Sequence, residues 1–470
     1  MDSVELRKEL PCRTLFRAIE NEEGLVWLDR ATGGPSFMAF DPVSQLRVGA
    51  DGRVLLACGA EETPLPSAPP DAIAEFVRRG TSPDHPTDLP HTFGYVGYDL
   101  AAAVESHTAV RADPAASLPR AHLAHYEVVL RCDPLFPRVE NSPCRITAFG
   151  RDRRKLAETV AAIERQLDDP DLARPVAEAP TGASRLVERP EQARYLRSVE
   201  RALDYIAAGD IYQINLAARF VAETALPAGD AYLRLREAQP VPFGVFFDGA
   251  GQTLLSNSPE RFLQVDGDAV STEPIKGTRP RAADADRDHA LAQELRTDPK
   301  ERAENVMIVD LERNDLGRIC ARGSVHVPSL LRVETWSTLH HLVSTVAGRL
   351  RPDASLASIL RATFPGGSIT GAPKIRATHL IAELEDQARE IYTGSFFAFA
   401  GPRHFDSSIL IRSAVLRGRK MQYHAGCGIV ADSDPAREFR ELELKALPFL
   451  RALGIVEKDA DAAPARDKTR

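Results

Sequence analysis

The sequence predicts an α+β fold, because segments with strand character and segments with helix character occur in groups. Short apolar runs bounded by Gly, Pro, Asn or Asp are typical of strands, and they gather in residues 25–57 and 243–272. Helical periods gather later, between residues 288 and 450. A doubly wound parallel sheet needs strict alternation of strand and helix, so this grouping favours α+β, with antiparallel pairing between the closely spaced strands.

In the N-terminal part, residues 1–60 are expected to form short strands and turns, followed by two helices and further strands. The expected strands are 25–28, 37–40, 46–49, 54–57, 91–100 and alternating stretches within 122–150, and the expected helices are 71–79 and 154–166. The stretch 168–190 is rich in Asp, Pro and Ala, and it is expected to be a linker or crossing loop. It would separate an N-terminal part, 1–167, from a C-terminal part, 191–456.

The C-terminal part opens with a helix at 191–208, whose apolar residues recur at the helical period and which stops at Gly209. Strands are expected at 211–216, 243–247, 253–256, 262–265, 269–272, 394–400 and 408–416. Helices are expected at 288–296, 300–309, 355–363, 373–384 and 435–450. The charged, alanine-rich tail 457–470 is expected to be disordered.

Composition narrows the class of protein. Apolar residues make up 43% of the chain and charged residues 27%, as in ordinary globular proteins, and the net charge of −8 does not predict nucleic-acid binding. No run reaches the ~18 apolar residues of a membrane span, and the charged N-terminus lacks the apolar core of a signal peptide. Six cysteines without a CxxC pair argue against a zinc site and for reduced thiols, so a cytoplasmic protein is expected.

The stretch 271–316 contains the first candidate site. Lys276 stands beside Gly277, which lets a neighbouring chain or a ligand come close. An ordinary lysine, with a pKa near ~10.4, is protonated at neutral pH, and burial or a nearby cation can free its lone pair for attack on carbon. Glu260, sixteen positions earlier, could move protons. The alternatives are a surface lysine in a turn, and a salt bridge between Glu260 and the adjacent Arg261.

Two pairs of glutamates form the second candidate site. Glu301 and Glu304 are three residues apart on one expected helix, and Glu438 and Glu441 have the same spacing on another. Four carboxylates without His or Cys suit Mg²⁺ better than zinc. Solvated acidic helix faces are the alternative explanation.

The Gly-rich stretch 366–374, Gly-Gly-Ser-Ile-Thr-Gly-Ala-Pro-Lys, forms the third candidate site. It lacks the order of a nucleotide P-loop, GxxxxGK[ST]. Pro373 fits the start of a helix, whose free N–H groups favour an anion such as a phosphate or a carboxylate. A turn that only starts a helix is the alternative.

These stretches, with Ser-Pro-Glu-Arg-Phe at 258–262 and Gly-Cys-Gly-Ile-Val at 426–430, resemble the chorismate-utilising enzymes. The resemblance covers about residues 190–450 strongly and the N-terminal part weakly. It implies two packed, largely antiparallel sheets that form a sandwich surrounded by helices, with both halves of the chain interleaved.

The resemblance also implies roles for individual residues. Lys276 would be a nucleophile, Glu260 a general acid or base, and His341, in preference to His340, would lie near the departing 4-hydroxyl. The four glutamates would bind Mg²⁺. The substrate would contact Gly277, Thr278, Ser368, Tyr392, Ile411, Arg412, Gly426, Gly428 and Lys445. Cys427 is interpreted as a small residue beneath the ligand, not as a nucleophile.

Some members of the family bind tryptophan in the N-terminal strands, as an effector or a structural ligand. The corresponding residues here are Asp29, Ser36, Phe37, Met38, Pro242, Phe243 and Gly244. Leu28-Asp29-Arg30 replaces the Leu-Glu-Ser pattern of feedback-inhibited relatives, so feedback inhibition is not expected.

Lysine at position 276 favours the aminodeoxychorismate synthase component I branch, which converts chorismate and ammonia to 4-amino-4-deoxychorismate. Because the chain has no Cys nucleophile elbow of a glutaminase, ammonia would come from a separate glutamine amidotransferase subunit. Two alternatives remain: anthranilate synthase component I, which needs no lysine nucleophile, and a non-catalytic tryptophan-binding regulator with the same fold.

Overall fold

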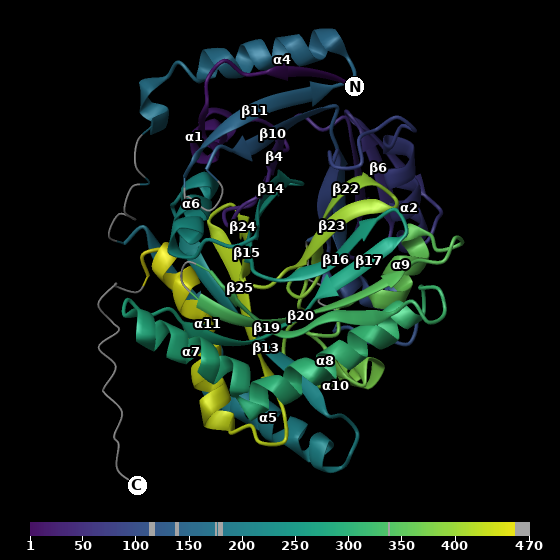
Figure 1. Cartoon of the computed structure of the whole chain (residues 1–470), viewed down its shortest axis with the longest axis vertical. Coiled ribbons are helices and arrows are strands. Elements are labelled where there is room, and N and C mark those ends of the chain that lie inside the picture. The colour runs from purple at the N-terminus through teal and green to yellow at the C-terminus, as the bar shows by residue number, and fades with distance from the viewer. Residues whose placement is uncertain (112–117, 137–140, 174–175, 177–181, 337–338, 456–470) are drawn as a thin grey trace.

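The computed structural model describes residues 1–111, 118–136, 141–173, 176, 182–336 and 339–455. Within these residues the strands form one sheet of 13 and one of 12, paired antiparallel throughout and surrounded by helices. The predicted α+β sandwich is therefore confirmed. In Figure 1 the sheets lie on either side of the middle of the molecule, with α4 outside β10 and β11, and with α5, α8 and α10 at the opposite end.

The 13-stranded sheet runs in the order β1-β11-β10-β4-β3-β14-β15-β24-β25-β13-β12, with β2 on β11 and β21 on β13. Its strands are β1 (Asp2–Glu5), β2 (Leu10–Pro11), β3 (Val26–Asp29), β4 (Ser36–Ala39), β10 (Val128–Pro134), β11 (Pro143–Gly150), β12 (Ser184–Glu188), β13 (Gln213–Thr224), β14 (Phe243–Gly249), β15 (Gln252–Ser258), β21 (Gly371–Ala372), β24 (Ser413–Arg417) and β25 (Lys420–Ile429).

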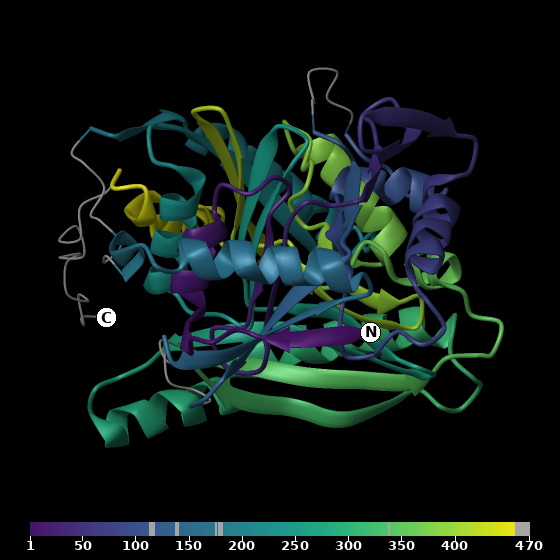
Figure 2. The ribbon, with the colours of Figure 1, turned by 90° about the horizontal axis from the view of Figure 1, so that it is seen from above.

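The 12-stranded sheet runs β18-β20-β17-β16-β23-β22-β8-β9-β5-β6-β7, with β19 on β20. Its strands are β5 (Ser44–Val48), β6 (Val54–Cys58), β7 (Glu61–Leu65), β8 (Thr92–Val96), β9 (Ala121–His125), β16 (Arg261–Asp266), β17 (Ala269–Glu273), β18 (Ile275–Pro280), β19 (His326–Thr335), β20 (Leu339–Arg349), β22 (Ser395–Gly401) and β23 (His404–Ile409). The long β19–β20 hairpin lies along one side of the molecule (Figure 2).

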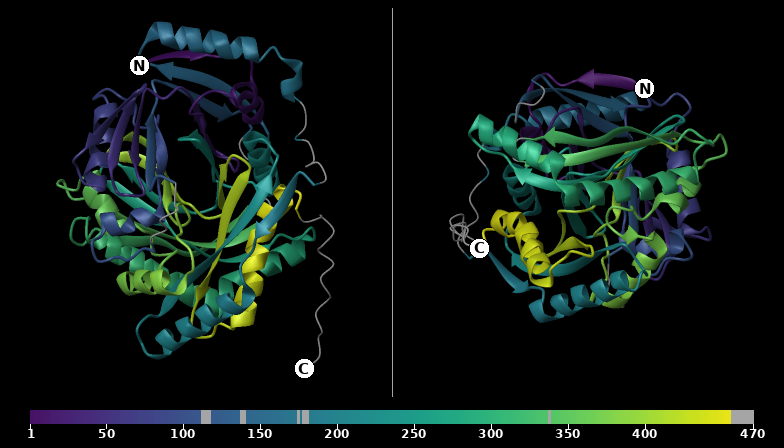
Figure 3. Two further views of the ribbon diagram at one scale, coloured as in Figure 1. Left: turned by 180° about the vertical axis from the view of Figure 1, so that it is seen from behind. Right: turned by 60° about the horizontal axis from the view of Figure 1, so that its bottom comes forward.

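The helices cover the outer faces of the sheets. They are α1 (Cys12–Ile19), α2 (Pro69–Gly80), α3 (Ala101–Val104), α4 (Arg153–Gln166), α5 (Gln192–Ala207), α6 (Ala228–Ala238), α7 (Ala285–Thr297), α8 (Pro299–Gly317), α9 (Leu356–Thr363), α10 (Lys374–Leu384) and α11 (Pro435–Ala452), with short 3₁₀ turns η1 (Tyr98–Leu100) and η2 (Pro170–Ala173). The C-terminal helix α11 packs against α5 and α6 (Figure 3). No described helix is long and apolar enough to cross a membrane.

Both sheets combine strands from the two ends of the chain. β3 pairs with β14, where Asp29 lies opposite Gly244, and β8 pairs with β22, where Tyr95 lies opposite Phe396. Each sheet is therefore built from N-terminal and C-terminal strands that lie side by side.

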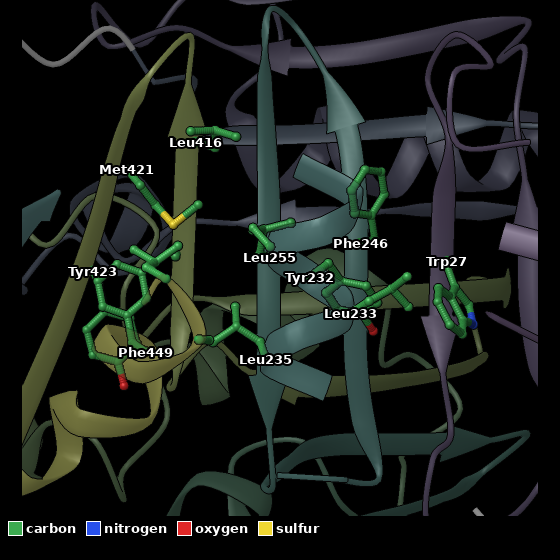
Figure 4. Packing of buried hydrophobic residues seen from close by; sticks show 14 of the residues in the cluster. Trp27, Tyr232, Leu233, Leu235, Phe246, Leu255, Leu416, Met421, Tyr423 and Phe449 are labelled. Atoms are coloured by element: carbon green, nitrogen blue, oxygen red, sulfur yellow. The ribbon is translucent and has the colours of Figure 1, made fainter. Parts of the chain in front are cut away.

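Neighbouring residues of a strand point to opposite faces, so the inner strands bury apolar side chains on both sides. Phe246 faces the outer helices, with its ring 5.8 Å from Tyr232 on α6 (Figure 4). The next residue, Phe247, faces the other sheet, with its ring 5.7 Å from Phe396. The core is accordingly layered, with helices outside and one apolar layer between the sheets.

Several sequence-based expectations for individual elements were wrong. The single strand expected at 408–416 is two strands, β23 and β24, which belong to different sheets. Both strands are buried, so the sequence is apolar through most of 408–416. No turn residue marks the point where the chain passes from one sheet to the other. Helix α1 lies where strands and turns were expected, and α6 was not predicted.

The stretch 168–190, expected to be a linker, includes strand β12, which pairs with β13 along Ser184–Glu188. The tail 457–470, expected to be disordered, lies outside the described residues.

Candidate active site

Lys276 lies on β18 beside a β-bulge. The pairing of β18 with β20 shifts by one residue between Lys276 and Thr278, and Gly277 is the extra residue. Gly277 has φ +75°, and a Cβ there would lie 2.9 Å from Glu301 Oε2, so glycine is required. The half-buried Lys276 donates a 3.0 Å hydrogen bond from Nζ to the backbone carbonyl of Ser368.

Glu260 lies in the turn between β15 and β16 and is 4% exposed. Its Oε1 accepts a 3.5 Å hydrogen bond from the backbone N–H of Ile275, the residue before Lys276. Burial raises the pKa of Glu260, and the positive charge of Lys276 opposes this rise. The alternative interpretation as a salt bridge is wrong, because Arg261 pairs with Asp406 at 3.0 Å.

The two adjacent histidines of β20 point to opposite faces. His341 Nδ1 lies 3.1 Å from Thr278 Oγ1, and its buried Nε2 has no hydrogen-bond partner among the described residues. Burial, together with the positive charge of Arg412, lowers the pKa of His341 to about 3, so the imidazole is neutral at neutral pH. His340 instead contacts Asp288 on α7, with 3.0 Å between Nε2 and Oδ1.

Arg412 lies at φ +52° in the segment that crosses from β23 to β24. Its Nη1 is buried and has no hydrogen-bond partner in the described part of the chain. Burial lowers the pKa of Arg412, with Tyr423 and Glu260 opposing that effect. Among the described residues, the buried Oγ of Ser368 has no partner in hydrogen-bond geometry, although it is near enough to Glu260 to lower the pKa of that carboxyl. Because a buried, unpaired cation is unfavourable, an anionic ligand at Arg412 would be stabilising.

Strands β13 and β25 bring glycines against two amide side chains. A Cβ on Gly426 would lie 2.7 Å from both Asn215 Oδ1 and Tyr392 Oη, and one on Gly428 would lie 2.7 Å from Gln213 Nε2. Asn215 Oδ1 and Gln213 Oε1 are buried without hydrogen-bond partners among the described residues. These two amides were not predicted from the sequence. The signal for them was polar residues alternating with apolar ones at the start of a buried strand.

The four glutamates come from α8 and α11 and affect one another electrostatically. Burial raises the pKa of Glu304, and the charges of Glu301 and Glu441 add to the rise. Burial and the charge of Glu441 raise the pKa of Glu438. Carboxylates that repel one another in this way fit a hard divalent cation, which prefers oxygen ligands and would offset their charge.

Cys427 is fully buried next to the second glutamate pair. Potential ligand atoms of Cys427, Glu438 and Glu441 lie within 4.8 Å of one another. Burial raises the pKa of Cys427 to about 12, so its thiol stays protonated and is unsuited to nucleophilic attack. Lys445 donates a 2.9 Å hydrogen bond to the Gly426 carbonyl and pairs with Glu441 at 2.8 Å.

Phe37, Pro242 and Phe243 of the predicted tryptophan pocket line a cavity of about 580 Å³, together with Pro259 and Ile275, the chain neighbours of Glu260 and Lys276. Arg30 lies in the same cavity. Its guanidinium pairs with Asp406 at 2.6 Å, donates a 3.1 Å hydrogen bond to the Pro242 carbonyl and lies 4.6 Å from the centre of the Phe243 ring.

The other four residues predicted for that pocket lie elsewhere. Asp29 is buried in a 2.5 Å ion pair with Arg236, and Asp29 and Ser36 line a separate hollow of about 40 Å³. Met38 lies in the hydrophobic cluster between the 13-stranded sheet and its outer helices. Gly244 packs against Asp29. Strand alternation explains the division, because Asp29 and Ser36 point away from the face that their neighbours present to the cavity.

Comparison with known proteins shows the class. The family of chorismate binding enzymes matches residues 23–451, and the chain belongs to this family. The structure is similar to anthranilate synthase component I from Streptococcus pneumoniae TIGR4, with a TM-score of 0.75, 28% identity, and coverage of 90% of this chain and 93% of that one.

The relatives in sequence have two different names. The chain is 41% identical over 397 residues to aminodeoxychorismate synthase of Streptomyces griseus, covering 80% of this chain and 53% of that protein, so it spans about half of that relative. It is 39% identical over 377 residues to anthranilate synthase component 1 of Thermus thermophilus, covering 79% and 80%. It is 40% identical over 350 residues to aminodeoxychorismate synthase component 1 of Klebsiella aerogenes, covering 74% of each. Similarity alone does not distinguish the two reactions.

Proposed function

We propose that the chain is the chorismate-aminating component of an aminodeoxychorismate synthase, which forms 4-amino-4-deoxychorismate for 4-aminobenzoate and folate synthesis. The observation that carries the proposal is the placement of Lys276. Its Nζ is held at 3.0 Å by the Ser368 carbonyl, and its charge acts on the buried carboxyl of Glu260. Anthranilate synthases commonly have alanine at this position, because their reaction needs no lysine nucleophile.

In the proposed reaction, Lys276 loses its proton and attacks C2 of the chorismate ring, both conjugated ring double bonds shift, and the C4 hydroxyl takes up a proton and leaves as water. Ammonia then adds at C4 and displaces the lysine, while the enolpyruvyl group is retained. Glu260 is the better proton donor to the departing hydroxyl, because burial raises its pKa and favours the acid form. His341 is neutral at neutral pH and would act through a hydrogen bond.

The substrate's enolpyruvyl carboxylate would bind Arg412 and Tyr392. The unpartnered Nη1 of Arg412 supports this role, because guanidinium and carboxylate form strong paired hydrogen bonds. We add Gln213 and Asn215 to the predicted contacts, since each has a buried amide oxygen without a partner in the described structure. The remaining proposed contacts are Gly277, Thr278, Ser368, Ile411, Gly426, Gly428 and Lys445.

Glu301, Glu304, Glu438 and Glu441 would hold Mg²⁺, and their mutual repulsion supports that assignment. When bound, the ion would supply positive charge that orients the ring carboxylate and stabilises negative charge. Lys445, paired with Glu441, keeps that carboxylate ionised: although burial opposes the effect, the ammonium lowers the pKa of Glu441.

Ammonia would come from a glutamine amidotransferase subunit, as the word component in the relatives' names suggests. A cytoplasmic location is part of the proposal and agrees with six cysteines that are all free in the structure.

The test is to mix the purified protein with chorismate, Mg²⁺ and ammonium and to identify the product by mass. Aminodeoxychorismate, with a substrate-derived adduct on Lys276 when ammonia is omitted, is the expected result. Anthranilate fluorescence without any added lyase would instead establish the second candidate, anthranilate synthase component I, whose relatives are about equally similar. Tryptophan binding without turnover would identify a regulator.

A further inference from the structure

One buried carboxyl group has no part in the chemistry proposed above. Glu312 lies on α8, two turns beyond Glu304, and is 3% exposed. Its Oε1 accepts a 3.0 Å hydrogen bond from the backbone N–H of Gly367. A Cβ on Gly367 would lie 3.0 Å from the same oxygen and 2.6 Å from Leu311 Cδ2, so the loop can approach the helix this closely only with glycine.

This contact lies next to the residue that holds the candidate nucleophile. Gly367 is followed by Ser368, whose carbonyl accepts the 3.0 Å hydrogen bond from Lys276 Nζ. The turn itself is closed by Thr370, whose hydroxyl donates a 2.9 Å hydrogen bond to the Gly366 carbonyl. A shift of Gly367 would therefore move the carbonyl that holds the lysine.

The far end of the loop is anchored separately. Lys374, the first residue of α10, forms an ion pair with Asp315 on α8 and donates a 3.1 Å hydrogen bond to the Thr363 carbonyl. Glu312 is thus the anchor next to Ser368, whereas the Asp315–Lys374 pair holds the segment where it enters α10.

Three charged groups act on Glu312. Asp315 on its own helix and Glu260 in the β15–β16 turn disfavour its ionisation, and Lys374 on α10 favours it. Burial, with the charges of Asp315 and Glu260, raises the pKa of Glu312 to about 8. The group is therefore a neutral acid at neutral pH and becomes a carboxylate in mildly alkaline solution.

We propose that Glu312 is a positioning residue for Lys276: it anchors Gly367, so that the Ser368 carbonyl holds the amine in place. Its ionisation would place a negative charge beside Glu260 and next to the Gly367–Ser368 peptide that holds the lysine. The inference rests on the proposed function, in which Lys276 is the nucleophile.

The experiment measures formation of the Lys276 adduct in a single turnover without ammonia, by intact mass, between pH 6.5 and 9.5. Glu312→Gln keeps the shape and an oxygen for Gly367 but cannot ionise. We expect its rate at pH 7 to be within about 3-fold of the parent and to keep rising above pH 8, where the parent rate levels off. Glu312→Ala, which leaves the Gly367 N–H unpaired, should be about 10-fold slower at every pH.

The matched control is Asp310→Asn, on the same helix, where the side chain is 77% exposed and pairs with Arg313. It should match the parent in rate and pH profile. Deuterium exchange of the backbone at 364–372 should quicken in Glu312→Ala but not in Asp310→Asn, a readout that needs no turnover.

Two results would overturn the inference: a Glu312→Gln profile that superimposes on the parent profile, or unchanged loop exchange in Glu312→Ala. Failure of the proposed function looks different, because the parent protein itself would then form neither the adduct nor aminodeoxychorismate.

Discussion

Two regions of the molecule each contain a half-buried arginine, and they differ in whether the protein satisfies its charge. Arg412 has a buried Nη1 with no hydrogen-bond partner in the described structure, and the buried Ser368 hydroxyl and Asn215 amide oxygen also lack partners there. Arg30, in the cavity of about 580 Å³, is paired with Asp406 and hydrogen-bonded to the Pro242 carbonyl.

This difference in pairing indicates where a ligand would bind. Buried polar groups are normally hydrogen-bonded, so a cluster of unpaired ones marks a place that a polar ligand completes. In the cavity of about 580 Å³, by contrast, the charges are already paired: Arg30 pairs with Asp406, and Asp406 also pairs with Arg261. We therefore expect function at Arg412 and a structural role at Arg30.

The largest expected effect concerns Lys276. Lys276→Ala should lower the rate of aminodeoxychorismate formation by about 10³-fold or more, because the covalent step loses its nucleophile. Steady-state assays with saturating ammonium would measure it, and the adduct should disappear from the mass spectrum. Lys420→Ala, at an exposed position in a hairpin, is the control. A Lys276→Ala protein with the parental rate would remove the nucleophile from the proposal.

The comparison is tested directly by exchanging each arginine for alanine. Arg412→Ala should raise KM for chorismate by about 10²-fold, because charge-assisted hydrogen bonds contribute ~1.5–3 kcal/mol and the buried Nη1 has no hydrogen-bond partner among the described residues. Initial rates over a range of chorismate concentrations give the value. An equal rise in KM for Arg30→Ala would show that the two regions do not differ as argued.

A third prediction concerns the histidines of the N-terminal region. Burial lowers the pKa of His91 to about 2 and of His125 to about 4, against about 6.5 in an unfolded chain. The unfolded chain takes up protons first as the pH falls, so stability is full above pH 6.5 and is lost as the pH falls towards 4 and below. The loss by pH 4 should be about 3 kcal/mol for His125 alone.

Urea unfolding midpoints between pH 7.5 and 4 measure this loss. His125→Asn should make the midpoint less dependent on pH, whereas His289→Gln, at an exposed position, should not. A parent protein whose midpoint stays constant over this range would contradict the assignment of neutral, buried histidines.

The smallest effect is expected for the stability of Arg30→Ala. Asp406 keeps Arg261 as a partner, so the loss should be about 1–2 kcal/mol, less than for a buried pair that leaves its partner uncompensated. Urea unfolding measures it, with Arg53→Ala, whose side chain is 79% exposed, as the control. No loss of stability would mean that the Arg30 network is not structural.

Most of the fold could be predicted because its signals are local. Turn residues around 25–57 and the helical period at 191–208 depend on neighbours in sequence, and the strands and helix expected there are present. The split of 408–416 into β23 and β24 could not be predicted in this way. Both strands are apolar, and only their partners, β16 and β22 for one and β15 and β25 for the other, separate them.

The motifs of the candidate site could be predicted from the sequence, but the full set of its residues could not. Lys276, Glu260 and Arg412 lie in recognisable stretches, and the structure brings them close enough for their charges to interact. Gln213, Asn215 and Glu312 were missed, because an amide or a carboxyl becomes notable only when its surroundings leave it unpaired or force it to keep a proton.

By itself the sequence determined the class of fold, the family and the chemical groups available for catalysis, since these depend on residue identity and on short-range spacing. The tertiary structure alone decided which groups have partners. Arg30 is satisfied by Asp406, 376 residues away, whereas Arg412 is left with an unpaired nitrogen. Pairing at that separation depends on how the two sheets assemble, because only the folded chain makes such residues neighbours.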